Sequence, residues 1–374
     1  MASRRFGVLG VLVAAGGLLG VAGPVAPCDP AGTDFCALPR AEDVVFLPGG
    51  SWFAVSSAAP DAPLQFIDAA TRRRRPLVLP FRLGDAPRAR TAPGRRAGSW
   101  GGAADCPGPP AQWRAGGNDV KRHGRVLRLV VLNRAETGAT VRDGDERIEL
   151  FDLSPDAAGP QARWVGCVPV PARWSLNDVA LAPDGTLYAS HQFDRPRSPG
   201  EAAATRQRWL SGSATGQVVE WTHRGGWRAV PGTALSFNNG VAVSPDGRTL
   251  AAAGTYSSAV LLLERRSGRV RRVALPHTPD NVTALEDGRF LSTGHTGVPV
   301  TGVDACRDPG AVPCGFPFAV AEVGGDGSVR VVFEHDGARI PGASVAAPHG
   351  GRLYLGSFFG DRVTVVEPAA VIVP

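Results

Sequence analysis

The chain has 374 residues, including 48 Gly and 33 Pro, and 43% of its residues are hydrophobic. This length allows a large core, and the composition is typical of many short strands joined by turns. The net charge of +6 is modest, and the one basic run, Arg72 to Arg75, has no aromatic interleaving or nucleic-acid motif around it. We therefore expect no nucleic-acid partner and interpret that run as a solvated loop.

The N-terminus has the pattern of an export signal. Arg4 and Arg5 precede an apolar stretch of small residues from Phe6 to Ala22. We expect residues 1–26 to be a signal peptide or, alternatively, an uncleaved anchor that associates with the membrane, followed by a single domain over 27–374. The predicted location is secreted, periplasmic or otherwise extracytoplasmic.

Six cysteines fit an oxidising compartment. Short loops favour the pairs Cys28–Cys36 and Cys306–Cys314, which leaves Cys106–Cys167, although other connectivities stay open. No Cys-x-x-Cys spacing occurs, so zinc or thiol redox chemistry is not expected.

A degenerate unit recurs along the chain: a polar start, an alternating apolar run, a Gly-containing turn and a second apolar run. The alternation around such turns predicts β-hairpins. The clearest copies begin at Glu42, Asn177, Asn239, Asp280 and Ala343, and a sixth unit is expected around 123–133 with 148–153. The turns lie roughly 40 to 60 residues apart, a spacing typical of propeller blades. We predict an all-β, six-bladed β-propeller, with loop insertions at 82–118 and 195–208.

Oxygen-bearing side chains stand at the starts of these strand-like segments. They are Glu42, Asn177, Asn239, Asp280 and Asn281. In a radial arrangement such strand ends converge on one axis. Carboxylates and amide carbonyls, without a thiolate or imidazole set, suit a hard cation such as Ca²⁺, although Asn and Asp before strands also cap turns. The sequence therefore predicts a central calcium site.

The same phrases resemble the paraoxonase/arylesterase family of calcium-dependent six-bladed propellers, within the SMP-30/gluconolactonase/strictosidine synthase-like group. The resemblance covers roughly Ala41 to Glu367 and rests on an ordered set of short phrases. These are Glu42-Asp43, His123-Gly124, Leu176-Asn177-Asp178-Val179, Asn239-Gly240-Val241, Asp280-Asn281-Val282 and Gly342-Ala343-Ser344-Val345-Ala346.

The resemblance implies two calcium ions. A catalytic ion would be held by Glu42, Asn177, Asn239, Asp280 and Asn281. A structural ion would be held by Asp43 and Asp178, with a backbone carbonyl near Arg125.

The resemblance also implies a pair of catalytic histidines, but only His123 matches. Arg134 stands at the second position, and a guanidinium does not act as a base near neutral pH. The base is therefore expected to be His123 alone, His295, or a carboxylate such as Glu42 or Asp280.

The predicted function is a secreted, calcium-dependent hydrolase of small-molecule lactones or aryl esters. One alternative is a non-catalytic binding propeller stabilised by calcium, favoured by Arg134 in place of histidine. Another is a propeller like the sugar lactonases or strictosidine synthases. No Gly-x-Ser-x-Gly elbow supports a serine hydrolase. The sequence leaves the substrate and the oligomeric state open.

Overall fold

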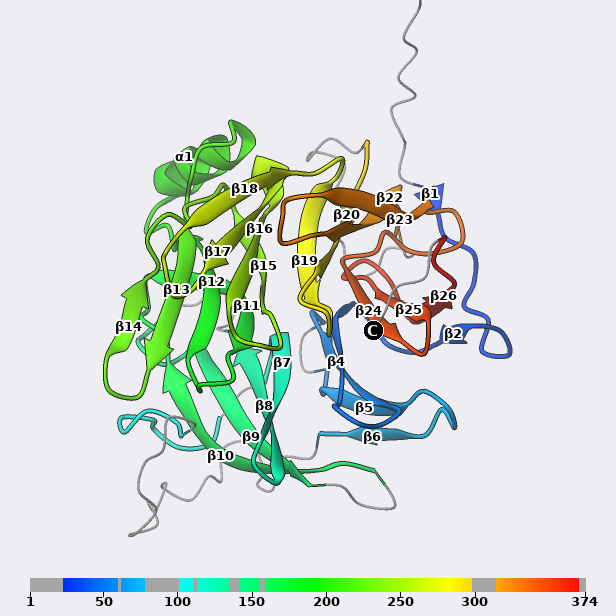
Figure 1. The fold of residues 1–374 in the computed structure, drawn as a ribbon, viewed down its shortest axis with the longest axis horizontal. Helices are drawn as coiled ribbons and strands as arrows, with labels where there is room; N and C mark the ends of the chain where they lie inside the picture. The colour runs from blue at the N-terminus through cyan, green and yellow to red at the C-terminus, as the bar shows by residue number, and fades with distance from the viewer. Residues whose placement is uncertain are drawn as a thin grey trace, which may run out of the picture.

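Six four-stranded antiparallel sheets, or blades, surround a central axis in the computed structural model (Figure 1). The structure describes residues 23–59, 62–77, 101–110, 113–134, 141–154, 159–297 and 314–369. The predicted all-β, six-bladed propeller is confirmed. The predicted leader over 1–26 lies almost wholly outside the described residues, as does Cys306.

The first three blades follow one another along the chain. Blade 1 consists of β3 (Ala41–Phe46), β4 (Trp52–Ser57), β5 (Gln65–Asp68) and β6 (Arg74–Pro76). Blade 2 consists of β7 (Ala115–His123), β8 (Val126–Asn133), β9 (Arg147–Ser154) and β10 (Gln161–Pro169). Blade 3 consists of β11 (Trp174–Leu181), β12 (Leu187–Asp194), β13 (Gln217–Thr222) and β14 (Gly226–Ala229).

The last three blades complete the ring. Blade 4 consists of β15 (Asn238–Val243), β16 (Thr249–Gly254), β17 (Ala259–Glu264) and β18 (Val270–Ala274). Blade 5 consists of β19 (Thr278–Ala284), β20 (Phe290–His295), β22 (Phe318–Val323) and β23 (Val329–His335). Blade 6 consists of β24 (Val345–His349), β25 (Arg352–Gly356), β26 (Val363–Val366) and β2 (Asp34–Phe35). A small extra pair joins β1 (Gly23–Pro24) to β21 (Cys314–Gly315), and a 3₁₀ turn covers Thr255–Ser257.

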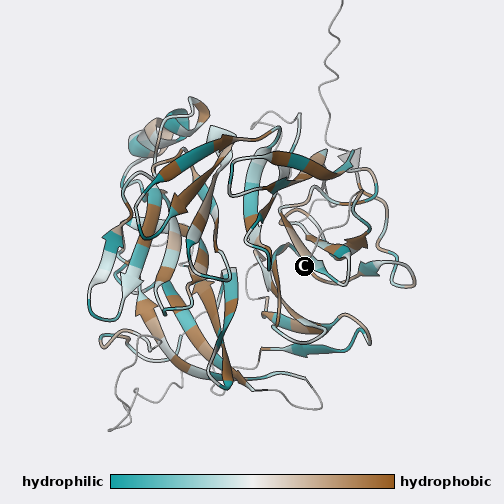
Figure 2. Ribbon diagram, in the orientation of Figure 1, coloured by the Kyte–Doolittle hydropathy of each residue, from teal (hydrophilic) through white to brown (hydrophobic). Residues whose placement is uncertain are grey.

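The hydrophobic core lies between neighbouring blades. Leu150 of blade 2 packs with Leu176 and Val219 of blade 3 in one buried cluster, and the other blade interfaces repeat this arrangement. Figure 2 shows hydrophobic residues concentrated along the strands. Glycines with positive φ close the predicted hairpin turns, as at Gly185 and Gly288. The first strands β3, β7, β11, β15, β19 and β24 contact one another around the axis.

The ring closes through β2, which supplies the outermost strand of blade 6 by pairing with β26. Asp34 accepts hydrogen bonds from Thr364 (2.8 Å) and from the buried guanidinium of Arg362 (3.1 Å). The propeller therefore closes by strand pairing and a buried ion pair among the described residues.

A helix replaces the loop insertion expected at 195–208. This helix, α1 (Pro199–Leu210), begins at Ser198, whose hydroxyl accepts from the Glu201 amide, and has Pro199 at its first position. It buries no residue, so it lacks the apolar stripe by which sequence periodicity identifies helices. Within the residues that the structure describes, neither this helix nor the 3₁₀ turn has the length and apolar character needed to cross a bilayer.

The N-terminal segment contains a disulfide of its own and is fixed to blade 1 by arginine contacts. The predicted disulfide Cys28–Cys36 is confirmed, as is Cys106–Cys167. Arg72 donates to the backbone carbonyls of Pro30 (3.0 Å) and Asp34 (2.7 Å). The interpretation of 72–75 as a merely solvated loop is therefore wrong for Arg72, whose guanidinium anchors this segment.

Candidate metal centre

Five of the six inner strands carry a β-bulge at the same level, near their first residues. The register shifts between Ala41 and Asp43 in β3, and at the corresponding places in β7, β11, β15 and β19. A bulge changes the direction in which side chains point. The residues in these bulges are Glu42, Gly116, Gly117, Asn177, Asp178, Asn239, Gly240, Asp280 and Asn281. Six of the seven predicted metal ligands therefore lie in this ring of bulges, and the seventh, Asp43, directly follows one.

Three side chains of this ring form the candidate centre: Glu42, Asn239 and Asp280. Asn239 Nδ2 donates to Thr255 Oγ1 (3.0 Å), whose own proton goes to the Pro279 carbonyl (2.9 Å). Because Thr255 must accept from Asn239, this contact fixes the orientation of the Asn239 amide. Asn239 Oδ1 and Glu42 Oε2 are both buried without a hydrogen-bond partner. Buried oxygens in proteins are normally satisfied by a protein group, an ordered water or an ion, so these two mark a place where a water or a cation would bind.

The electrostatics of the ring favour a bound cation. Burial, together with the charge of Glu42, raises the pKa of Asp280 to about 8. Burial likewise raises the pKa of Asp43 to about 7 and the pKa of Asp178 well above its usual value. A cation would relieve this cost by replacing the protons. Among the described residues, no group of three or more His, Cys, Asp or Glu has metal-holding geometry, so the candidate set depends on amide oxygens.

Glu42 is held in place through its backbone. Its carbonyl accepts hydrogen bonds from Asn281 Nδ2 (3.2 Å) and from Ser344 Oγ (3.0 Å). Asn281 therefore joins blade 5 to blade 1, because it donates toward Glu42. Asn177 contributes its backbone carbonyl to the centre, where it accepts from Arg134 (3.0 Å).

Asp43 and Asp178 join consecutive inner strands. Asp43 accepts from the amides of Val44 (2.9 Å) and Asn118 (2.7 Å). Asp178 accepts from those of Val179 (2.7 Å) and Val241 (2.8 Å). Each carboxylate thus binds one amide of its own blade and one of the next. The predicted third ligand of this site, a carbonyl near Arg125, is not brought to it, since Arg125 follows the far end of β7.

Arg134 lies directly against Glu42. Its Nη2 is 2.9 Å from Glu42 Oε1, and its Nε is buried without a partner. A Cβ on Gly116 would lie 2.5 Å from that Nε. Burial alone would lower the pKa of Arg134, but the carboxylates around it, chiefly Glu42, raise it above the usual value. The centre therefore contains one fixed positive charge of its own.

His295 lies beside the ring at the end of β20. Burial lowers its pKa to about 4, so the imidazole is neutral near pH 7, and its Nε2 has no hydrogen-bond partner. Its ring contacts the rings of Phe316 and Phe359. His277 is also buried, and its Nε2 lies 3.1 Å from Ser292 Oγ.

The structure separates His123 from the other predicted site residues. It is the last residue of β7, whereas the bulge with Gly116 lies near the first. The six residue steps from Gly117 to His123 correspond to about 20 Å of strand. The adjacent Arg122 donates to the carbonyl of Pro48, in the hairpin turn that follows β3. The backbone of His123 therefore belongs to the opposite end of the axis from Glu42.

Sequence reasoning missed the start of blade 2. Residues 115–118 were expected in a loop insertion, but they begin β7 and place Gly116, Gly117 and Asn118 in or beside the ring. The available signal was Asn118-Asp119-Val120, which has the same letters as Asn177-Asp178-Val179. Asp119 joins strands as Asp178 does, by accepting from the amides of Val120 and Leu181.

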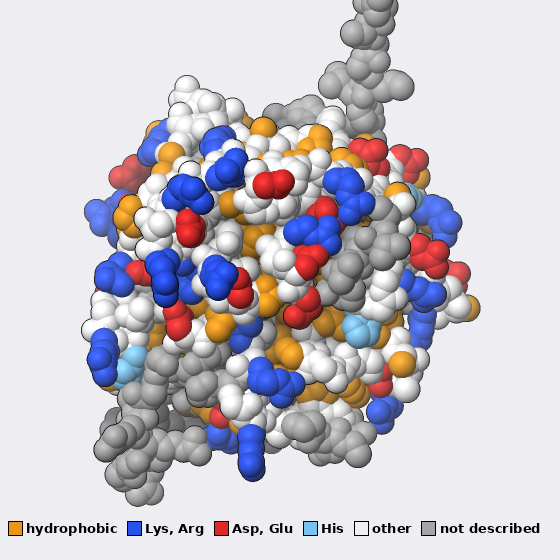
Figure 3. All heavy atoms as spheres, in the orientation of Figure 1, with side chains coloured by type: hydrophobic (Ala, Val, Ile, Leu, Met, Phe, Trp, Pro, Cys, Tyr) orange, Lys and Arg blue, Asp and Glu red, His pale blue; other side chains and the backbone are white. Residues whose placement is uncertain are grey.

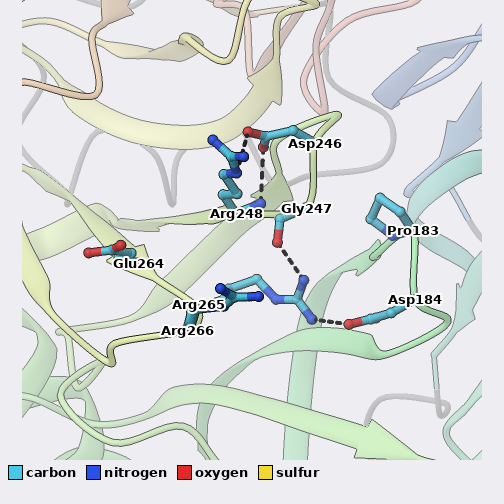
Figure 4. Close-up of a pocket in the computed structure, with 8 residues that line it drawn as sticks. All are labelled: Pro183, Asp184, Asp246, Gly247, Arg248, Glu264, Arg265 and Arg266. Carbon is cyan, nitrogen blue, oxygen red and sulfur yellow. Dashed lines mark hydrogen bonds and ion pairs between the residues drawn. The ribbon is translucent and has the colours of Figure 1, made fainter.

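Two hollows lie away from the ring. A cavity of about 730 Å³ runs along the axis from Asp43 and Asp178 to the hairpin turns near Pro48 and His349. A cleft of about 680 Å³ lies at the outer surface between blades 3 and 4, where Arg265 points at Asp184 (Figure 4). Two acidic side chains of that cleft, Asp184 and Asp246, pair with its basic residues Arg265 and Arg248. On the face in Figure 3, acidic and basic side chains are interspersed.

The raised pKa of Asp280 predicts how the stability of the metal-free protein depends on pH. The unfolded chain releases this proton near pH 4, whereas the folded protein keeps it until about pH 8. Stability therefore falls as pH rises through this window. We expect the Tm in chelator to be several degrees lower at pH 8.5 than at pH 6, with a smaller difference in Ca²⁺. Asp280→Asn, which does not titrate, should make the dependence shallower without abolishing it, because burial also raises the pKa of Asp43 and of Asp178; an unchanged slope in that variant would contradict this assignment.

Comparisons with known proteins support the fold. No family model matches the chain, and no curated protein matches it. A luciferin-regenerating enzyme is similar, with 12% identity and a TM-score of 0.51 over 91% of this chain and 96% of that chain. Regucalcin, a calcium-binding protein of Agrobacterium tumefaciens, has 12% identity and a TM-score of 0.49 over 91% and 94%. An aldose sugar dehydrogenase of Streptomyces coelicolor, solved with PQQ, has 16% identity and a TM-score of 0.46 over 89% and 95%. At these identities the likeness shows the fold alone.

Proposed function

We propose that the protein is a calcium-dependent hydrolase of lactones or aryl esters, with its catalytic ion at the ring of bulges. The observation that carries this proposal is the convergence of unpartnered, buried oxygens from Glu42 and Asn239 beside Asp280. Carboxylate and amide oxygens in this combination match the preference of Ca²⁺. Asn177 and Asn281, from neighbouring bulges, complete the proposed ligand set.

The ion would polarise the substrate carbonyl and stabilise the oxyanion that develops on it. The chain must also supply a base to take a proton from the attacking water. His295 is neutral near pH 7 with no hydrogen-bond partner at Nε2, and Asp280 would become a carboxylate at the centre once an ion displaces its proton, so these two are the proposed bases. Arg134 is excluded from this role by its chemistry, and His123 by its place at the other end of β7.

A second ion is proposed at the level of Asp43 and Asp178. Burial raises the pKa values of both carboxyl groups, and the charge of Glu42 adds to this at Asp43, as the charge of Asp43 does at Asp178. Asn118 Oδ1 is buried there without a partner, while its Nδ2 donates to Asp43 (3.0 Å). Asn118 thus replaces the predicted carbonyl near Arg125 in the proposed set, and the role of this ion is to brace three inner strands.

A non-catalytic propeller is the second candidate function. It is favoured by Gly116, which puts no side chain in the ring, and by Arg134 against Glu42, because neither provides a base. The two disulfides support an extracytoplasmic location under either candidate function.

A substrate panel with and without calcium tests the proposal. Purified protein is assayed on an aryl ester, an apolar lactone and a sugar lactone in Ca²⁺, after chelation, and after calcium is returned. We expect turnover of at least one substrate that falls to background in chelator and recovers with Ca²⁺. Turnover unaffected by complete calcium removal would sink the proposal. No turnover by folded, calcium-bound protein would favour the binding propeller, and preference for the sugar lactone would favour a sugar-lactonase type.

A further inference from the structure

Arg134 contacts the same oxygens that a metal ion in this ring would bind. The side chain reaches the ring from the residue after β8, and its Nη2 contacts both Glu42 Oε1 (2.9 Å) and the Asn177 carbonyl (3.0 Å). Both partners belong to the proposed ligand set. A guanidinium carries a permanent positive charge and donates in a fixed planar geometry. It therefore satisfies the same oxygens that a cation would attract.

Gly116 makes room for this arginine. Blade 2 has glycine at the first bulge position, where blades 1, 3, 4 and 5 have Glu42, Asn177, Asn239 and Asp280. A Cβ there would lie 2.5 Å from Arg134 Nε and 3.2 Å from Nη2. The arginine therefore depends on the glycine, because the guanidinium of Arg134 occupies the space that a side chain at position 116 would fill.

Several buried carboxyl groups surround Arg134, and its positive charge offsets theirs. Glu42, Asp43, Asp178 and Asp280 are all buried. Buried carboxylates without a counter-charge destabilise a fold. Arg134 is the basic residue paired with Glu42, and its charge acts on Asp280 as well.

We infer that Arg134 is a resident cation of the ring, which keeps the metal-free centre folded and competes with Ca²⁺ for Glu42. The competition follows from geometry, since Glu42 Oε1 is bound to the guanidinium and only Oε2 is free. Full use of the Glu42 carboxylate by an ion requires the ion pair to break. The claim that Arg134 competes with Ca²⁺ rests on the proposed calcium site. The claim that it stabilises the metal-free protein rests on the ion pair with Glu42 alone.

The test compares four metal-free proteins: wild type, Arg134→Gln, Gly116→Ala and Arg330→Gln. Arg134→Gln removes the charge and keeps a donor of similar length. Gly116→Ala leaves Arg134 in the chain but displaces its guanidinium, a flexible group that can move. Arg330 is 46% exposed and paired with Glu322 on blade 5, so its substitution is the matched control. Calcium affinity is measured by calorimetric titration and stability by thermal unfolding in chelator.

We expect Arg134→Gln and Gly116→Ala to bind Ca²⁺ about tenfold more tightly than wild type, because a like charge leaves the site. We also expect the metal-free Tm of Arg134→Gln to fall by several degrees, since an unpaired buried carboxylate remains. Arg330→Gln should change neither quantity. Affinity that is unchanged or weaker in Arg134→Gln would overturn the competition.

A failure of the proposed function has a different signature. If none of the four proteins binds Ca²⁺, the calcium site itself is refuted. The metal-free Tm values still test, in that case, whether Arg134 stabilises the centre. A lower metal-free Tm of Arg134→Gln then supports the resident cation, and an unchanged Tm overturns it.

Discussion

Asp280→Ala is expected to reduce calcium-dependent hydrolysis by about 100-fold or more. The substitution removes a buried carboxylate from the proposed ligand set, and with it the charge that would attract the ion. The metal-free fold should persist or gain stability, because Asp280 is an acid whose burial raises its pKa to about 8. Initial rates on the best substrate of the panel, measured in saturating Ca²⁺, give the result.

The control is Asp326→Ala, which removes an acid from a turn on the same blade and away from the ring. Asp326 accepts from Ser328 in the turn between β22 and β23. Its substitution should leave the rate within about twofold of wild type. If Asp280→Ala keeps full calcium-dependent activity, the ion is held elsewhere and the ring is not the catalytic site.

Gly117→Ala is expected to destabilise the protein by at least about 3 kcal/mol, enough to prevent folding in most conditions. A Cβ at Gly117 would overlap the Asp178 carboxylate and lie 2.6 Å from the Asp178 Cα. Both belong to a buried inner strand that cannot move without disturbing its contacts to blade 4. Yield of soluble protein and chemical denaturation monitored by tryptophan fluorescence give the measurement.

The neighbouring Gly116 provides the matched control. A Cβ there meets the guanidinium of Arg134, the end of a flexible side chain, rather than backbone. Gly116→Ala should therefore fold, although Gly117→Ala should not. Equal stability of the two variants would show that β7 and β11 do not approach each other as closely as described.

The fold was predictable because five blades begin with polar phrases followed by apolar runs and a Gly turn. The phrases at Asn177, Asn239 and Asp280 proved to be the bulged starts of β11, β15 and β19. The start of blade 2 escaped because its bulge consists of Gly116 and Gly117. Glycines have no side chain that sequence reasoning would recognise as part of a site, and His123-Gly124 lay further along the same strand.

The contact between Arg134 and Glu42 could not be read from the sequence. The two residues lie 92 positions apart and meet only because blades 1 and 2 are adjacent around the axis. The sequence showed that Arg134 stands where the resemblance implies a second histidine. It did not show where the Arg134 side chain lies, because that depends on the space left by Gly116. Helix α1 was missed for a different reason, since it is exposed and has no apolar periodicity.

The most direct measurement is a calorimetric titration of Ca²⁺ into metal-free wild-type protein and into the Asp280→Ala and Asn239→Ala variants. The account predicts saturable binding by wild type that is weakened or lost in both variants, while Asp326→Ala binds normally. Folded wild type that shows no saturable binding, or undiminished binding in both ring variants, would contradict the central claim that this ring is a calcium site.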